Sequence, residues 1–142
     1  MDMSKCIDRF LEPQKTSYAI ALEEVRNGRK VSHWMWYIFP QLKGLGRSSM
    51  SEFYGIEDLG EAIAFLNDPY LGNNLRSITQ ALLDLNRNDA RAIFHSPDDK
   101  KFRSSMTLFA CAAPEENIFQ AALDRFFNGA RDRRTLSMLK LD

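Results

Sequence analysis

The sequence predicts an all-α protein, a single compact helical domain of about six to eight helices that spans residues 1–142. Two observations lead to this prediction. Apolar residues recur at intervals of three and four along most of the chain, which is the spacing of one helix face. No segment of the sequence shows the sustained alternation of apolar and polar residues that is typical of a half-buried strand.

The first third of the chain predicts two helices and a short aromatic one. The opening helix should end before Pro13, because the residue that precedes a proline disfavours the α conformation. The second helix carries Tyr18 and Leu22 on one face and should end at Gly28, which suits a left-handed cap. Ser32 is expected to cap a third helix over residues 33–39.

The clearest helical pattern lies in the middle of the chain. Asp58 should cap a short helix. A proline at position 69 should end that helix, and a longer helix that runs to Leu85 should follow. The apolar residues of that longer helix alternate steps of four and three and form one stripe. They are Leu71, Leu75, Ile78, Leu82 and Leu85.

The last third predicts further helices. Ser96, Pro97 and Asp98 form a typical helix start, with a cap, a proline and an acid in the first turn. Another helix should begin at Pro114 and end at Gly129, and a final short helix should dock on the core through the tail. We expect these helices to share one core, since a chain of 142 residues buries about two thirds of its surface on folding.

Charge and cysteine content narrow the class of function. The chain has 19 basic and 19 acidic residues, so no overall field attracts a nucleic acid, and that class of partner is disfavoured. Cys6 and Cys111 belong to no metal-binding or redox motif, so we expect no metal site and a cytoplasmic location. The longest uncharged apolar run, residues 34–40, is too short to cross a bilayer, which argues against a membrane protein.

The segment between Glu24 and Glu52 has five cations and no acidic residue. Within it, Gly44 and Gly46 could bring backbone N–H groups towards an anion, and Lys43, Arg47 and Ser48 could bind its oxygens. The other interpretation is that the remaining cations, Arg26, Arg29 and Lys30, only complement the end of a helix.

An aromatic segment, residues 32–40, precedes this loop. On a helix Trp34 and Trp36 point about 200° apart, so one should be buried while the other approaches the surface, where it could stack on a ligand. Two other interpretations stay open. The segment could anchor the core, or it could form an exposed patch for a protein partner.

Three further residues are candidates for chemistry. His33 could act as a general base and Asp98 as a general acid or base, while Ser105 could contact a ligand. Each also has a structural interpretation, because acids at a helix start complement its dipole and most histidines form ordinary hydrogen bonds. The leading hypothesis is a pocket for an anionic, nucleotide-like or phosphorylated small metabolite, between residues 32–48 and the helix start near Asp98. Hydrolysis is the least demanding reaction for such a site, whereas cofactors stay undefined.

Five blocks together resemble an uncharacterised microbial family, domain of unknown function 1810, whose members are sometimes labelled calpastatin. They are SHWMWYIFPQ from Ser32, GLGRS from Gly44, DPYLG from Asp68, SPDD from Ser96 and SSMTLF from Ser104. The resemblance covers nearly the whole chain, and it implies no particular reaction. The calpastatin label conflicts with the sequence, because calpastatin inhibitory regions are extended and disordered whereas these helix stripes predict a folded globule.

Overall fold

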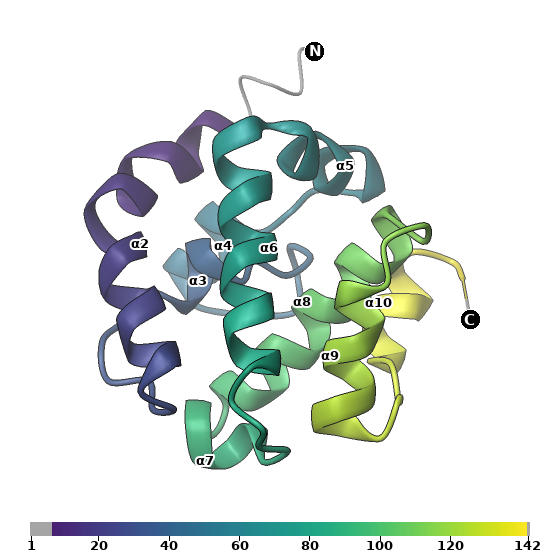
Figure 1. Ribbon diagram of the computed structural model, residues 1–142. Helices are drawn as coiled ribbons and strands as arrows, with labels where there is room; N and C mark the ends of the chain where they lie inside the picture. The colour runs from purple at the N-terminus through teal and green to yellow at the C-terminus, as the bar shows by residue number, and fades with distance from the viewer. Residues whose placement is uncertain (1–6, 142) are drawn as a thin grey trace.

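The computed structural model describes residues 7–141, which form nine α-helices and one short 3-10 helix and contain no strand (Figure 1). This confirms the predicted all-α class. In chain order the elements are η1 (Asp8–Phe10), α2 (Leu11–Arg26), α3 (Met35–Ile38), α4 (Ser49–Tyr54), α5 (Leu59–Asn67), α6 (Pro69–Leu83), α7 (Ala90–Phe94), α8 (Asp98–Ala112), α9 (Ile118–Phe127) and α10 (Arg133–Met138).

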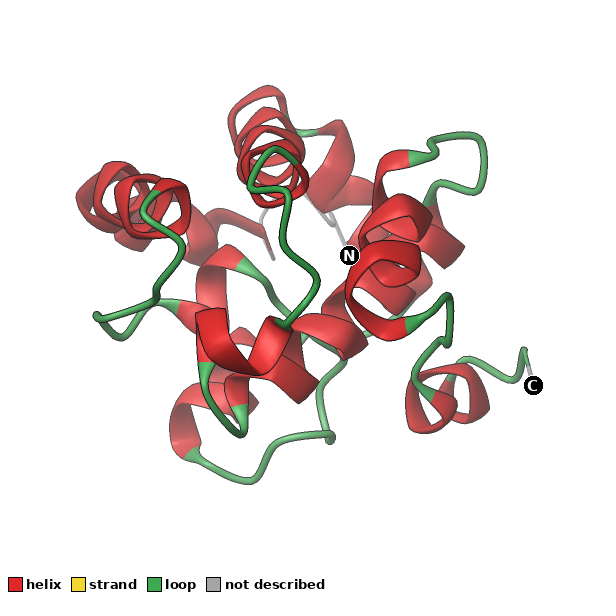
Figure 2. Cartoon of the chain, turned by 60° about the horizontal axis from the view of Figure 1, so that its bottom comes forward, coloured by secondary structure: helices red, strands yellow, loops and turns green. Residues whose placement is uncertain are grey.

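Helix α6 lies across the front of the molecule between α2 and α9, and α8 passes behind it (Figure 1). Its predicted apolar stripe faces the core: Leu71, Leu75, Ile78 and Leu82 are all buried. Helix α8 packs mainly against α9 and α5, and the loops run over the outside of the helices (Figure 2). The long helices therefore build a frame to which the shorter helices and loops attach.

Aspartates begin several of these helices, and Asp58 does so as the sequence predicts. The side chain of Asp58 accepts a hydrogen bond from the backbone N–H of Glu61 at the start of α5. Asp68 caps α6 and Asp89 caps α7 in the same way. Each cap satisfies a backbone donor that the helix itself leaves unpaired.

A cluster of phenylalanine rings fills the centre of the core. Phe102, fully buried on α8, lies 4.7 Å from the ring of Phe94, 5.1 Å from Phe39 and 5.9 Å from Phe126, measured between ring centroids. These rings come from three helices and from the C-terminal end of α3. The aromatic segment thus contributes directly to the core through Phe39.

The predicted break before Pro13 is wrong. Helix α2 begins at Leu11 and includes Pro13 in its first turn, where the backbone N–H that proline lacks has no intrahelical partner. The proline therefore fits without disturbing the helix. At the other end of α2, Gly28 has φ +77° and is the left-handed cap that the sequence predicts.

Several other boundaries differ from the prediction: α9 begins at Ile118 and not at Pro114, and no side chain caps α8. Ser32 caps no helix, and α3 covers only residues 35–38. Helix α4, with six residues, is absent from the predicted set because so short a helix has no apolar period of its own. Such short elements raise the number of α-helices in residues 7–141 above the predicted six to eight.

None of the helices described here has both the length and the apolar character that crossing a membrane requires. Within residues 7–141, no group of three His, Cys, Asp or Glu side chains is placed to hold a metal ion. Cys111 is half-buried and unbridged, whereas Cys6 lies outside the described residues.

Candidate functional site

The aromatic segment is tied to α2 by a carboxylate ten residues before Trp34. One oxygen of Glu24 accepts hydrogen bonds from the backbone N–H groups of Val31 at 2.7 Å and Ser32 at 2.8 Å, and from the indole Nε1 of Trp34 at 3.0 Å. The other oxygen accepts the Ser32 hydroxyl at 2.6 Å. Ser32 is therefore a donor to Glu24, and it caps no helix because α3 begins only at Met35, with Trp34 in the cap position.

These hydrogen bonds change the acidity of Glu24. Desolvation raises the pKa of the carboxyl group, but the donors from Ser32, Val31 and Trp34 favour the ionised form more strongly and lower the pKa to about 2. Glu24 is thus a permanent anion at neutral pH. It fixes the chain that leads from α2 into the aromatic segment.

Most of the aromatic segment is core. Trp34 is 1 % exposed, and the ammonium of Lys30 lies 5.2 Å from the centroid of its ring, so it presents no surface on which a ligand could stack. Tyr37 and Phe39 are also buried, and Trp36 is half-buried. The segment therefore forms no exposed aromatic patch of the kind that a protein partner would require.

The two candidate acid–base residues lie in separate environments. His33 is exposed. A carboxylate oxygen of Asp98 lies 3.0 Å from the ammonium of Lys30, whose side chain is 8 % exposed. Asp98 is thus paired with a buried cation at the start of α8, and neither candidate is among the described residues that line the pocket described below.

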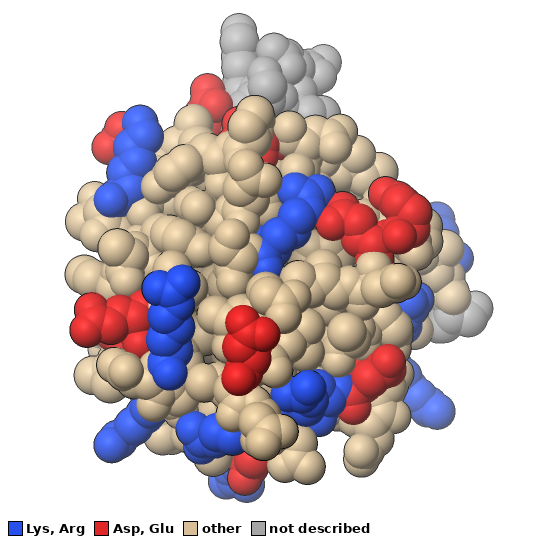
Figure 3. All heavy atoms as spheres, viewed as in Figure 1, with Lys and Arg blue, Asp and Glu red and all other residues tan. Residues whose placement is uncertain are grey.

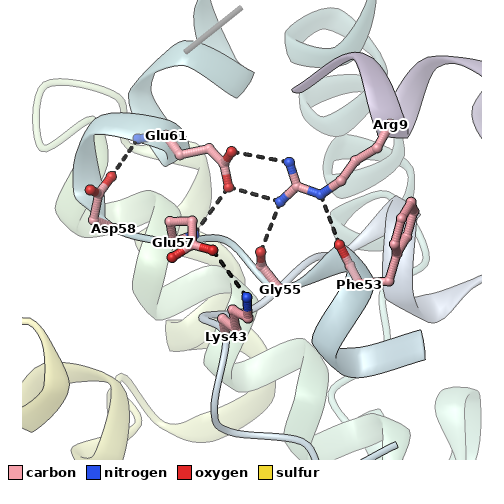
Figure 4. A network of polar contacts seen from close by, with 7 residues as sticks. All are labelled: Arg9, Lys43, Phe53, Gly55, Glu57, Asp58 and Glu61. Atoms are coloured by element: carbon pink, nitrogen blue, oxygen red, sulfur yellow. Dashed lines mark hydrogen bonds and ion pairs between the residues drawn. The ribbon is translucent and has the colours of Figure 1, made fainter. Parts of the chain in front are cut away.

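Lys43 forms an ion pair in the segment that precedes α5. Its ammonium lies 3.2 Å from a carboxylate oxygen of Glu57, beside the buried ion pair between Arg9 and Glu61 (Figure 4). Arg9 holds both oxygens of Glu61 at 2.8 and 3.0 Å and also donates to the carbonyl of Gly55 at 2.8 Å. This network joins the start of the chain to α5.

The two loop glycines have different structural roles. Gly44 has φ +100°, a left-handed conformation that favours glycine. A Cβ on Gly46 would collide with the side chain of Ser51, so glycine is needed there for close packing. Ser48 caps α4 through a hydrogen bond from the Ser51 backbone, while Arg47 is exposed.

A surface pocket lies where the loop over residues 41–48 meets α8 and α10; we call it the basic pocket. It has a volume of about 270 Å³ and is lined by Gln41, Leu45, Gly46, Pro97, Lys100, Lys101, Ser104, Asp132 and Arg134. It lies between the two segments that the sequence indicates, residues 32–48 and the helix start near Asp98. Among the described residues that line it, Gly46 is the only predicted ligand-binding residue.

Three cationic side chains and one carboxylate line the basic pocket. Neither Lys100 nor Arg134 forms an ion pair within the described part of the chain. Asp132 caps α10 through one oxygen, which accepts the backbone N–H of Thr135 at 2.9 Å and the hydroxyl of Thr135 at 2.6 Å, and it keeps its negative charge, so the lining has three positive charges against one. The pocket is therefore locally electropositive in a protein of zero net charge.

The third cation, Lys101, is held loosely. Its ammonium lies 3.8 Å from an oxygen of Asp98, which is longer than a direct hydrogen bond, and 5.9 Å from the centroid of the Trp36 ring. The other oxygen of Asp98 is occupied by Lys30. Lys101 can thus turn towards an incoming anion without leaving Asp98 unpaired.

A narrow hollow adjoins the basic pocket and shares Gln41 and Lys101 with it; we call it the Trp36 recess. It is lined by Met35, Trp36, Phe39, Gln41, Ser51, Tyr54, Gly55 and Lys101. Its volume of about 10 Å³ is close to the minimum for one water molecule. Ser105, one turn after Lys101 on α8, is fully buried, and its hydroxyl has no hydrogen-bond partner among the described residues.

Sequence reasoning missed most residues of the basic pocket. Lys100 and Lys101 are adjacent to the predicted helix start, so their proximity to the glycine loop follows once those two segments are placed together. Arg134 and Asp132 come from the tail, about thirty residues further along. No spacing in the sequence connects the tail with the loop, because that contact depends on how α10 packs against α8.

Together these observations define an all-α protein with a basic surface pocket at the junction of a glycine-containing loop, α8 and α10. A family model described as "Protein of unknown function (DUF1810)" matches residues 4–139, and the chain belongs to this family. The resemblance inferred from the five sequence blocks is thereby confirmed.

A solved structure has the same fold. The crystal structure of the conserved hypothetical protein Rv1873 from Mycobacterium tuberculosis is similar with a TM-score of 0.92 and 42% sequence identity, over 96% of this chain and 97% of that chain. Among curated proteins, none matches the chain significantly. The comparisons thus support the fold and the family, and function has to be argued from the site itself.

Proposed function

We propose that this protein binds a small anionic metabolite in the basic pocket. The observation that carries the proposal is the charge around the pocket: Lys100, Lys101 and Arg134 line it against a single carboxylate among the described residues, which caps a helix. Cations that surround a concave site attract an anion and bind it more strongly than isolated surface charges do.

The charge around the pocket is a local feature. On the face of the molecule drawn in Figure 3, Lys and Arg side chains are interspersed with Asp and Glu side chains. The protein has no net charge, so a large polyanion such as a nucleic acid gains little from the surface as a whole. A small anion needs only the pocket. A cytoplasmic location, which we also propose, would give it access to phosphorylated metabolites.

We confine the proposal to binding. A hydrolase needs a general acid or base within hydrogen-bond reach of its substrate. The described residues of the pocket include no histidine, and their one carboxylate, Asp132, holds the start of α10. His33 is exposed away from this lining and Asp98 is paired with Lys30, so the two candidate residues support no turnover here.

Thermal unfolding in the presence of inorganic phosphate tests the proposal. Phosphate at ten times its dissociation constant should stabilise the native state by about 1.4 kcal/mol. For a chain of this size we expect the Tm to rise by about 4 °C. Sodium chloride at the same ionic strength serves as the control for screening.

A pair of neighbouring arginines provides matched variants. Arg133 and Arg134 are consecutive and exposed on α10, but only Arg134 is among the described residues that line the pocket. Arg134→Gln should weaken phosphate binding about tenfold, whereas Arg133→Gln should leave it nearly unchanged. An equal loss in both variants, or no stabilisation of the wild type by phosphate, would contradict the proposal.

A further inference from the structure

We infer that Asp98 sets the affinity of the basic pocket by competing with the bound anion for the ammonium of Lys101. This inference rests on the proposed function and concerns what regulates the same site. Asp98 acts on the ligand through Lys101, so it is a positioning residue. Three observations support the inference: Asp98 is shared by two lysines, one of these lysines is buried, and the other lines the pocket.

The carboxylate of Asp98 is shared unequally between two ammonium groups. One of its oxygens lies 3.0 Å from the ammonium of Lys30, within the range of a direct hydrogen bond. The other oxygen lies 3.8 Å from the ammonium of Lys101, beyond that range. Lys101 is therefore the more weakly held of the two partners.

Lys30 is fixed at Asp98. Its side chain is 8 % exposed, and its backbone N–H donates a hydrogen bond to the carbonyl of Ile93 at 2.8 Å. Its ammonium also lies 5.2 Å from the centroid of the buried Trp34 ring. Because a buried ammonium without a counter-charge is costly, Lys30 stays paired with Asp98 when an anion binds.

Lys101 is free to change partner. Its side chain is 25 % exposed and lines both the basic pocket and the Trp36 recess. A lysine has a flexible four-carbon stem, so its ammonium can turn into the pocket while the stem stays in place. Asp98 and a bound anion are both negative, and they therefore compete for this one ammonium.

The charges of this cluster predict effects of opposite sign. Removing the charge of Asp98 releases Lys101, so an anion should bind more tightly. Removing the charge of Lys30 leaves Asp98 with Lys101 as its partner in the cluster, so an anion should bind more weakly. If either residue had only a structural role, its replacement would weaken binding in both cases.

Isothermal titration calorimetry with inorganic phosphate at constant ionic strength tests the inference. Asp98→Asn should bind phosphate about threefold more tightly than the wild type, although its Tm should fall because Lys30 loses its partner. Asp99→Asn is the matched control. It removes the same charge from the same first turn of α8, but Asp99 forms no ion pair with another described residue. Its dissociation constant should change by less than about 1.5-fold.

A second background shows whether the effect passes through Lys101. In Lys101→Gln, the added replacement Asp98→Asn should change the dissociation constant by less than about 1.5-fold. Equal tightening in both backgrounds, equal tightening by Asp99→Asn, or weaker or unchanged binding by Asp98→Asn alone would overturn the inference while leaving anion binding in place. If the wild type does not bind phosphate, the proposed function fails and the inference fails with it.

Lys30→Met gives an independent test should Asp98→Asn fail to fold. It replaces a buried ammonium with an apolar side chain and should weaken phosphate binding about threefold. Arg29→Met removes a charge of the same sign from the exposed neighbouring residue and should change binding by less than about 1.5-fold. Unchanged or tighter binding in Lys30→Met, or an equal loss in Arg29→Met, would overturn the inference.

Discussion

Replacing Glu24 with glutamine removes the charge that holds the start of the aromatic segment while it keeps nearly the same shape. Glu24 accepts four hydrogen bonds, from two backbone N–H groups, the Ser32 hydroxyl and the Trp34 indole. A glutamine can accept the three N–H donors through its one carbonyl oxygen, but those bonds then lose the contribution of the negative charge.

The pKa of Glu24 gives the magnitude. Its fall from 4.5 to about 2 corresponds to about 3 kcal/mol at 1.36 kcal/mol per pKa unit. Because the carboxylate is only partly buried, solvent screening reduces this to about 1–2 kcal/mol. We therefore expect Glu24→Gln to lower the free energy of unfolding by about 1–2 kcal/mol at pH 7. Glu24→Ala should cost about 3 kcal/mol, since it also leaves the buried Trp34 indole unpaired.

The effect should depend on pH in a defined direction. Because the folded protein has the lower pKa, Glu24 stabilises it fully above pH 4.5, and this contribution declines as the pH falls from 4.5 towards 2. Urea unfolding, followed by tryptophan fluorescence at several pH values, measures the difference between wild type and Glu24→Gln. A difference below about 0.3 kcal/mol at pH 7, or one that is unchanged near pH 2, would refute the reasoning.

Two further substitutions test the packing of the fold. Glu61→Ala should lower the free energy of unfolding by about 3 kcal/mol in urea unfolding. The side chain of Glu61 is fully buried, and its removal leaves the charge of Arg9 without this partner. A decrease below about 1 kcal/mol would show that the pair contributes little. Gly72→Ala should lower the Tm because its Cβ would collide with the backbone carbonyl of Leu66, at a cost of about 1–3 kcal/mol. The matched control, Gly60→Ala in the exposed first turn of α5, should be neutral or stabilising by about 0.5 kcal/mol; a similar loss in both variants would contradict the packing argument.

The parts of the fold that the sequence predicts well are those that depend on near neighbours. The stripe of α6 and the cap at Asp58 require contacts only three or four residues apart, and the structure confirms them. Ser32 is of a residue type that favours a helix cap, but its backbone N–H and its hydroxyl are both held by Glu24 on the preceding helix. At this position the tertiary contact with Glu24 outweighs the local preference of serine for a helix cap.

The candidate site was predictable at the level of segments. The glycine loop and the start of α8 do meet at a pocket, as the charge and glycine patterns suggest. Individual residues were harder, because a run of cations does not show where each one points: Lys30 pairs with Asp98 and Lys43 with Glu57, and both are thereby removed from the pocket. Arg134 joins the pocket through the packing of a helix that has too few residues for a pattern of its own.

Nuclear magnetic resonance offers the most direct test that the basic pocket binds an anion. Titration of inorganic phosphate into the ¹⁵N-labelled protein reports where the anion binds through changes in the backbone amide shifts. We predict saturable changes that centre on Gly46, Lys100, Lys101 and Arg134, and that are absent with sodium chloride at equal ionic strength. Changes that centre elsewhere, for example on Arg26 and Arg29 at the end of α2, or no saturable change at all, would contradict the account.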